Sequence, residues 1–509
     1  MTGRDGFTTS LWQATSEPYL SSSVISTQKE FDIIITGGGI TGLSTALKLQ
    51  QAGLKCLLLE ARNLCYGTTG GTTAHINTFF DTPYSSIQQD FGKEQAKQVH
   101  AAAVAALETI KQNIREYGID CGFEHVPAYI YAENKEQEKQ FEDILSSGKE
   151  VGLDIAETNE LPAPHSFLRV LKINGQARFH PVRYVYGLAK AFESIGGTIL
   201  QQCRLTNVKT GDRIEAETTQ GTFIARKLIY ATHTLPGINL LHLRLVPYRS
   251  YAMAVELKDD QYPTPLYYDL QEPYHYFRTQ EIDGKRYLIA GGKDHKTGEE
   301  ENTNKQFREL EAIIRKSYAV KEITHNWSSQ YYEPADGLPY IGHLPGFSDN
   351  IYVATGFGGN GMTYSGIAAQ VLTDMLTRSG ESQLGSLFSP GRIKPVAGFT
   401  EFVTHNAHVA LNFLGKLLPS DRIDGLSELA PGEGRVVKLD NNRLGIYKDE
   451  GGKVYAVNTA CTHMKCSVKW NSAERSWDCP CHGARFSISG EVLNAPADLP
   501  LERIELDKE

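Results

Sequence analysis

The chain lacks the features that mark a protein for nucleic acid, for export or for a membrane. Its 51 basic and 60 acidic residues leave a net charge of −9, which offers nothing to attract a polyanion. Residues 1–23 contain neither an apolar run nor paired arginines, so they show no export signal. We therefore expect a cytoplasmic protein that does not bind nucleic acid.

Cysteine is also scarce, with eight in 509 residues. Four of them are scattered through the first half of the chain, at Cys56, Cys65, Cys121 and Cys203. Such a distribution is not a disulfide scaffold, and it suits an intracellular protein. The other four all lie within the range 461–481 and point to a local site.

Two of these cysteines stand beside histidines in two short arms. The first arm holds Cys461 and His463, and the second, after 15 intervening residues, holds Cys479 and His482. This is the Rieske ligand pattern, in which two thiolates hold one iron of a [2Fe-2S] cluster and two imidazoles hold the other. Zinc accepts the same four ligands, but zinc fingers usually place both cysteines in one arm. We therefore expect a [2Fe-2S] cluster.

The two arms resemble the cytochrome bc type of Rieske protein. That resemblance implies a disulfide between Cys466 and Cys481, with two free thiols as the alternative, and a proline-containing loop over the cluster at 494–500. High-potential members carry a serine and a tyrosine where this chain has Ala484 and Phe486. The resemblance therefore also implies a cluster of low potential for this type.

A second motif begins with an apolar, β-branched run at residues 31–36. The glycine-rich sequence after it, a helical segment and a second strand that ends in Glu60 complete a dinucleotide-binding unit. In such a unit the glycines allow a tight turn and a close approach to a pyrophosphate, and the acid accepts hydrogen bonds from a ribose. The expected contacts of this unit are Gly37, Gly39, Ile40, Thr41, Gly42 and Glu60.

A third motif identifies the dinucleotide. The sequence DGLPYIG at 336–342, a strand at 350–355 and GFGGNG at 356–361 resemble the second flavin motif of the D-amino-acid oxidase, glycine oxidase and sarcosine oxidase superfamily. GFGGNG could also bind a nicotinamide nucleotide, but no second strand ending in an acid follows it. The resemblance covers residues 10–390 and implies FAD. It adds these expected FAD contacts: Arg62, Thr68, Val208, Gly358, Gly361, Met362 and Thr363.

The expected fold is α/β, with a Rossmann-like FAD-binding domain, an antiparallel-sheet substrate domain and a small all-β Rieske domain. The expected boundaries are 1–390 for the oxidoreductase, 391–425 for a linker and 426–509 for the Rieske domain. Residues 399–418 have helical spacing, and we expect this helix to dock on the flavin domain. Peripheral contact with a membrane is the less favoured alternative, because its polar face has a single lysine.

The residues that contact substrate are harder to assign. The candidates are His75, Tyr276, Arg278 and Tyr331. Amine-oxidising relatives often carry an arginine for the substrate carboxylate where this chain has Tyr331, so an ordinary amino acid is a poor substrate unless Arg278 replaces it. Sarcosine-oxidase-type relatives also place a lysine near the flavin to promote the reaction with oxygen. The corresponding strand at 287–291 has no lysine.

These motifs together predict an FAD-dependent oxidoreductase that dehydrogenates a small amine and passes electrons through the cluster to an external carrier. In the first alternative, the cluster feeds electrons to the flavin for a reduction or a monooxygenation. In the second, the protein transfers electrons or senses redox state without catalysis.

Overall fold

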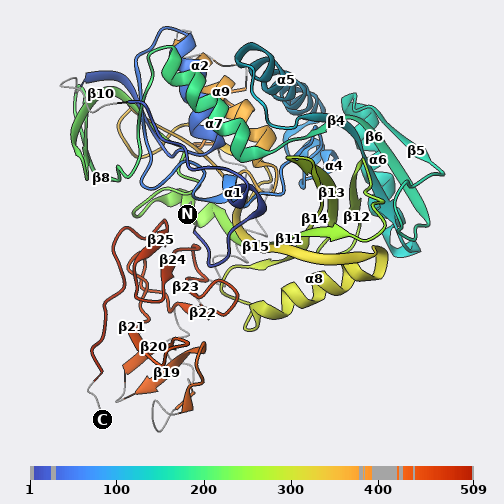
Figure 1. The fold of residues 1–509 in the computed structure, drawn as a ribbon. Coiled ribbons are helices and arrows are strands. Elements are labelled where there is room, and N and C mark those ends of the chain that lie inside the picture. The colour runs from blue at the N-terminus through green and yellow to red at the C-terminus, as the bar shows by residue number, and fades with distance from the viewer. Residues whose placement is uncertain are drawn as a thin grey trace.

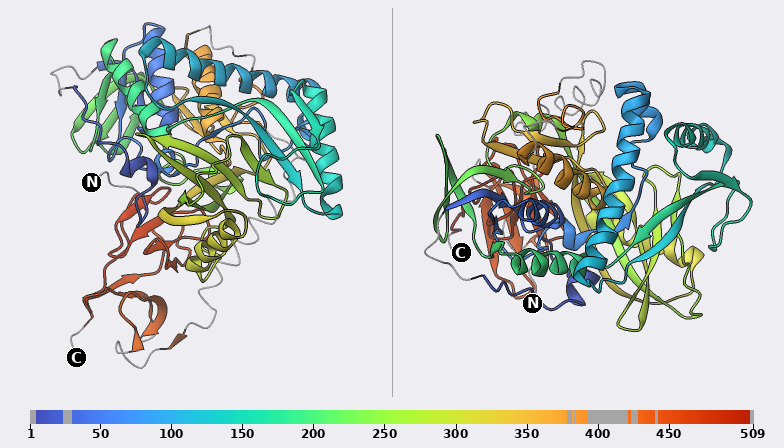
Figure 2. Two further views of the ribbon diagram at one scale, coloured as in Figure 1. Left: turned by 45° about the vertical axis from the view of Figure 1, so that its right-hand side comes forward. Right: turned by 90° about the horizontal axis from the view of Figure 1, so that it is seen from above.

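The computed structural model describes residues 5–23, 30–377, 382, 384–392, 421–422, 428–439 and 442–506. These ranges form a body of two large sheets with their helices, and a C-terminal part of two small sheets (Figure 1). The C-terminal part projects from one side of the body (Figure 2). The predicted fold class is confirmed.

A mostly parallel sheet forms the dinucleotide-binding half of the body. It comprises β1 (Glu30–Thr36), β2 (Cys56–Leu59), β7 (Thr198–Leu200), β8 (Leu205–Thr210), β9 (Ile214–Thr218), β10 (Gly221–Tyr230), β16 (Tyr340–His343) and β17 (Ile351–Thr355). The order is β16-β17-β10-β1-β2-β7, and β9 joins β8 to β10. Neighbours from β17 to β7 are parallel, and β16 is antiparallel. The apolar runs of β1 and β2 are buried, as strands covered on both faces require.

Three helices pack together on this sheet: α2 (Ile40–Gln51), α7 (Pro181–Ser194) and α9 (Gly361–Thr377). His180 caps α7 by accepting a hydrogen bond from the Arg183 N–H, and Pro181 occupies its first turn. The other helices are α1 (Leu11–Ala14), α3 (Thr68–Gly71), α4 (Tyr84–Phe91), α5 (Lys93–Tyr117), α6 (Glu138–Val151) and α8 (Thr303–Ser317), with 3-10 turns η1 (Lys135–Gln137) and η2 (Leu240–Arg244).

The second large sheet is almost wholly antiparallel. It comprises β3 (His75–Ile76), β4 (Glu124–Ala132), β5 (Ile155–Thr158), β6 (Arg169–Arg178), β11 (Leu245–Leu257), β12 (Leu266–Asp269), β13 (Tyr276–Ile282), β14 (Lys285–Lys296) and β15 (Val320–Pro334). The order is β15-β11-β14-β13-β12-β4-β6-β3, with β5 on β6. Helix α8 packs on β11 and β14. This is the predicted substrate-domain sheet.

The C-terminal part contains two four-stranded sheets. The first comprises β18 (Asp421–Arg422), β19 (Gly434–Leu439), β20 (Asn442–Lys448) and β21 (Val454–Asn458), and the second β22 (Lys469–Asn471), β23 (Ser476–Asp478), β24 (Arg485–Ser487) and β25 (Val492–Asn494). The second sheet is the one that lies against the body (Figure 1).

Buried charges hold this second sheet against the body. Arg249 on β11 lies 3.6 Å from Glu474 and 3.9 Å from Asp478. Arg485 lies 3.1 Å from Asp478 and 3.7 Å from Asp5 in the N-terminal segment. These five side chains are at most 2% exposed. Because buried charges are tolerated only when they are paired, the network favours this docked arrangement.

Within the described ranges, no helix is both long and apolar enough to cross a membrane. The predicted helix at 399–418 lies outside the described residues.

Candidate functional site

The glycine turn after β1 has no room for side chains. A Cβ on Gly37, whose φ is +107°, would lie 2.3 Å from the Ala231 carbonyl oxygen, and one on Gly42 would lie 1.9 Å from the Gly37 carbonyl oxygen. The turn leads directly into the N-terminus of α2, where Gly39 is the N-cap residue. Backbone N–H groups at such a helix start bind phosphate.

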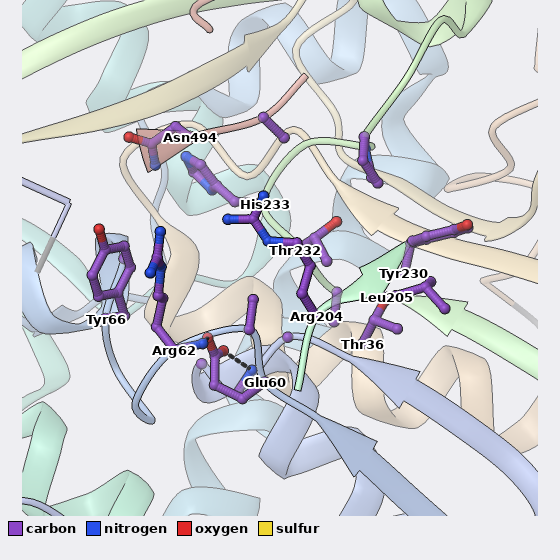
Figure 3. Close-up of a pocket in the computed structure, with 18 of the residues that line it drawn as sticks. Thr36, Glu60, Arg62, Tyr66, Arg204, Leu205, Tyr230, Thr232, His233 and Asn494 are labelled. Atoms are coloured by element: carbon purple, nitrogen blue, oxygen red, sulfur yellow. Dashed lines mark hydrogen bonds between the residues drawn. The ribbon is translucent and has the colours of Figure 1, made fainter. Parts of the chain in front are cut away.

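A cavity of about 450 Å³ opens beside this turn. Its walls come from the turn and the end of β2, from residues 203–206 and 230–233, and from residues 492–499 of the C-terminal part. Figure 3 shows Glu60 and Arg62 on one side and His233 and Asn494 on the other. The predicted contacts that line it are Gly37, Gly39, Thr41, Glu60, Arg62 and Thr68.

The other predicted contacts of the first unit lie outside this lining. Ile40 and Gly42 are buried in the first turn of α2, behind the cavity wall. Val208 lies on β8 and packs against a separate core cluster, while residues 203–206 stand at the cavity. The predicted contact Val208 therefore lies two residues beyond the end of this lining segment.

Glu60 follows β2 at the cavity wall. Its carboxylate accepts hydrogen bonds from the N–H groups of Gly38 and Arg62, each at 2.7 Å, and burial raises its pKa. A fixed carboxylate there can accept hydrogen bonds from a ribose diol, and the cavity volume is typical of ligand sites. The residues present fit FAD.

The second glycine motif, GFGGNG at 356–361, also contributes to the wall of the cavity. Gly356 and Phe357 line the cavity, and the Gly358 N–H donates to the Tyr332 carbonyl at 3.0 Å. The remaining predicted contacts lie just beyond the lining, where α9 begins at Gly361. Met362 is buried there, and the Thr363 hydroxyl donates to the Asn77 carbonyl at 2.7 Å. Because β17 lies between β10 and the antiparallel β16, this turn has no second parallel strand for a separate nucleotide.

The four predicted cluster ligands converge in the C-terminal part. The thiols of Cys461 and Cys479 are in hydrogen-bonding contact, and the rings of His463 and His482 are 5.0 Å apart at 90°. All four are buried. Two thiols and two imidazoles in this arrangement fit a Rieske [2Fe-2S] cluster.

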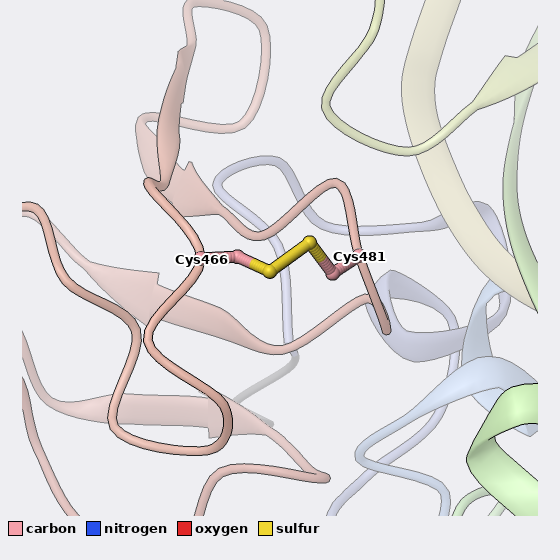
Figure 4. Close-up of a disulfide and its surroundings, with 2 residues drawn as sticks. All are labelled: Cys466 and Cys481. Atoms are coloured by element: carbon pink, nitrogen blue, oxygen red, sulfur yellow. A yellow bond between two sulfur atoms is a disulfide. The ribbon is translucent and has the colours of Figure 1, made fainter. Parts of the chain in front are cut away.

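A disulfide joins the two cluster loops, as predicted. Cys466 and Cys481 are bonded, with their Cα atoms 6.5 Å apart (Figure 4). Their sulfurs and that of Cys479 lie within 4.8 Å of one another. The disulfide leaves only Cys479 of these three able to serve as a thiolate ligand.

The cluster loops contact the flavin cavity through aromatic side chains. His233 lines the cavity, and its ring lies 4.9 Å from that of Tyr332. The Tyr332 hydroxyl donates to the His482 carbonyl at 3.4 Å, and His242 lies 4.9 Å from the His463 ring. Two aromatic residues therefore connect the cavity wall with a cluster ligand.

A group of half-buried side chains lies on the substrate-domain sheet; we call Tyr248, Tyr274, Tyr276, Tyr331 and Asp294 the tyrosine–aspartate cluster. The Tyr331 hydroxyl donates to Asp294 at 2.8 Å and its ring stacks on Tyr248 at 5.7 Å. Tyr274 lies 5.6 Å from Tyr276. Burial raises the pKa of Asp294 to about 6. The predicted candidates Tyr276 and Tyr331 thus lie in one group.

The other two candidates have different surroundings. The His75 ring lies 5.4 Å from Tyr276, and burial, helped by the charge of Arg278, holds its pKa well below the usual range. Arg278 is fully buried and donates to the carbonyls of Ala74 and Phe179. These bonds fix the strand that carries His75. Arg278 is the residue that would have to replace the missing arginine for an ordinary amino acid to be a good substrate, and these bonds direct its guanidinium to the backbone.

Sequence reasoning missed Tyr248, His233 and His242. Tyr248 reaches the site only because β11 pairs with β15 and sets it opposite Tyr331. The two histidines become relevant only when the cluster loops dock beside them. No local pattern in the sequence marks any of the three.

Two family models match this chain. The model for FAD dependent oxidoreductases matches residues 32–375, and the model for the Rieske [2Fe-2S] domain matches residues 422–505. The chain belongs to the FAD dependent oxidoreductase family and carries a C-terminal Rieske domain. Its cofactors are FAD and a [2Fe-2S] cluster, so the zinc alternative for the four ligands does not hold.

Known relatives share this organisation or part of it. The putative Rieske 2Fe-2S iron-sulfur protein YhfW of Bacillus subtilis is 33% identical over 97% of both chains. Gamma-glutamylputrescine oxidoreductase of Escherichia coli is 22% identical over 74% of this FAD oxidoreductase and 90% of its own length. Glycine oxidase from Geobacillus kaustophilus shares the fold, with a TM-score of 0.61 at 17% identity over 72% of this chain and all of its own.

Proposed function

We propose that this FAD oxidoreductase dehydrogenates a small amine and passes the electrons through its Rieske cluster to an external one-electron carrier. FAD can accept a hydride from a substrate, and the cluster can transfer one electron at a time. The observation that carries the proposal is the shared wall, because residues 492–499 of the Rieske domain line the flavin cavity.

The contacts between the two domains support direct electron exchange. His233 and Tyr332 lead from the cavity wall to the backbone of His482, and the Gln330 side chain donates to the Gly483 carbonyl at 2.8 Å. The buried charges around Arg249 keep this contact in place. A separate carrier protein is therefore not required between flavin and cluster.

The residues around β14 support a dehydrogenase rather than an oxidase. The strand section predicted to lack a lysine, 287–291, is buried within the sheet. The nearby Lys293 pairs with Glu309 on α8 at 2.6 Å. This lysine is thus engaged by a helix and is not available to promote a reaction with oxygen at the flavin.

The proposal divides the chain into an oxidoreductase at 1–390, a linker at 391–425 and the Rieske domain at 426–509. It places the protein in the cytoplasm, on the strength of the scattered thiols.

Anaerobic titration of the holoenzyme with small amines tests the function. We expect flavin bleaching followed by reduction of the cluster. Reduction of the flavin only when the cluster is reduced first would favour the reverse direction of electron flow. A flavin that no amine reduces, in a protein that still exchanges electrons, would favour a non-catalytic carrier or sensor.

A further inference from the structure

The tyrosine–aspartate cluster is linked to the second glycine motif and to the segment after α3. On one side, Thr73, two residues beyond the end of α3, hydrogen-bonds Tyr276. On the other side, Asp81 accepts hydrogen bonds from the Gly359 N–H and from the Tyr274 hydroxyl, each at 2.9 Å. Tyr276 therefore contacts the segment after α3, and Asp81 links Tyr274 to the second glycine motif.

The carboxylate at its centre is desolvated. Asp294 Oδ2 accepts the Tyr331 hydroxyl, the Ser250 side chain also hydrogen-bonds the carboxylate, and Oδ1 is buried. The carboxylate of Asp81 is close enough to raise the pKa of Asp294 further. A desolvated acid beside a like charge is costly unless a cation or a donor completes it.

The tyrosines complete a site for a cation. Tyr248 and Tyr331 are stacked, Tyr274 and Tyr276 are neighbours, and all four are partly exposed. The faces of aromatic rings attract ammonium groups, and phenol hydroxyls accept their hydrogen bonds.

The same surroundings disfavour a carboxylate. Arg278 is bonded to backbone carbonyls, and Arg249 donates to Ser328 at 2.6 Å and pairs with Glu474 and Asp478 of the Rieske domain. An anionic group beside the amine would meet Asp294 and Asp81 instead of a guanidinium.

We infer that the tyrosine–aspartate cluster binds the substrate, and that it selects an organic ammonium ion without a carboxylate on the carbon next to nitrogen. This inference rests on the proposed amine dehydrogenation and names its substrate class. Asp294 provides the anionic contact, and the four tyrosines provide the aromatic walls.

Binding to the oxidised holoenzyme tests the inference, with the flavin absorption spectrum as the readout. The probes are three molecules with matched chains: n-pentylammonium, norleucine and 1-pentanol. We expect n-pentylammonium to bind about tenfold or more tightly than either other probe, since only it offers a cation without a carboxylate. Norleucine or 1-pentanol binding as tightly as n-pentylammonium would overturn the inference, and this comparison needs no variant.

Two variants locate the contact. Asp294→Asn removes the charge at nearly constant shape, and we expect a loss of about tenfold or more in affinity for n-pentylammonium. Asp259→Asn, in the exposed turn after β11, changes the net charge equally and should leave the affinity unchanged. FAD content and the visible circular dichroism of the cluster verify folding in each variant. Equal affinity in the two variants would refute the assignment of Asp294.

The pH dependence gives an independent readout. The pKa of Asp294 is raised to about 6, so below that pH the side chain takes up a proton and loses the charge that holds the ammonium ion. We expect affinity to fall as the pH drops through 6, and Asp294→Asn to remove this dependence. The titratable groups that face Asp294 are Asp81, Tyr274, Tyr276, His275 and Tyr331. A dependence that survives in Asp294→Asn would overturn the inference.

This test separates the inference from the proposed function. If n-pentylammonium binds through Asp294 but reduces no flavin, the site stands and the dehydrogenation fails. If norleucine reduces the flavin while n-pentylammonium does not bind, the dehydrogenation stands and the selection for an amine without a carboxylate is wrong.

Discussion

Removing the carboxylate of Glu474 should loosen the Rieske domain from the flavin domain. This side chain is fully buried, 3.6 Å from Arg249 and 4.0 Å from Arg485. It also accepts hydrogen bonds from the Phe7 N–H at 2.7 Å, from the Ser328 N–H at 3.1 Å and from the Ser328 hydroxyl. Glu474→Ala would therefore leave two guanidinium groups with one fewer counter-charge and three donors without this acceptor.

The size of the effect follows from these distances. At an effective dielectric constant of about 20, unit charges separated by 3.6 to 4.0 Å attract by roughly 4–5 kcal/mol before desolvation is subtracted. Measured costs of removing one partner of a buried pair are about 3–5 kcal/mol, and we expect Glu474→Ala to fall in that range. The effect should appear first at the interface between the Rieske domain and the flavin domain.

Urea titration provides the assay, with cluster circular dichroism and flavin fluorescence recorded separately because two domains need not unfold together. With a slope of about 1–3 kcal/mol per molar urea, the midpoint of the cluster signal should fall by at least about 1 M. The matched control is Glu450→Ala, whose carboxylate is 65% exposed and pairs with Arg475 at 3.1 Å. A surface pair of this kind contributes less than about 1 kcal/mol. Equal midpoints for the two variants would refute the reasoning.

Three further predictions concern the cofactors and their reactivity. His463→Ala should abolish the cluster but leave one FAD bound per chain, since the two cofactors lie in separate domains; metal analysis and flavin absorbance check this, and loss of both cofactors would contradict it. Because Lys293 is held by Glu309, chemically reduced protein should react slowly with oxygen and faster with artificial one-electron acceptors; rapid peroxide formation independent of the cluster would show an ordinary oxidase. The cluster potential should lie in the lower half of the range of about −150 to +300 mV, because Ala484 and Phe486 are buried beside the cluster and offer no side-chain donor. In a redox titration Ala484→Ser and Phe486→Tyr should each raise the cluster potential. No shift in either variant would contradict the prediction that missing donors lower this potential.

The sequence alone determined the parts of the molecule that are built locally. The glycine turn, the acid after β2 and the two cluster arms each lie in a short stretch of chain, so residue spacing sets their geometry directly. The disulfide between the arms was implied by the family resemblance, and the structure forms it. The position of Val208, which the resemblance implied, lies two residues outside the cavity lining, because which residues of an extended segment face a cavity depends on where that segment bends.

Only the tertiary structure decided how these parts meet. The tyrosine–aspartate cluster takes Tyr248 from β11, Asp294 from β14 and Tyr331 from β15, strands that become neighbours through long-range pairing. The buried charges that dock the Rieske domain join Asp5, Arg249 and Glu474, which lie at opposite ends and in the middle of the chain. Pairing of distant strands and the exclusion of water from charges are properties of the assembled core. Local periodicity therefore carries no record of them. The sequence could name Tyr276 and Tyr331 as candidates, but not their grouping with Tyr248 or the docking of the Rieske domain.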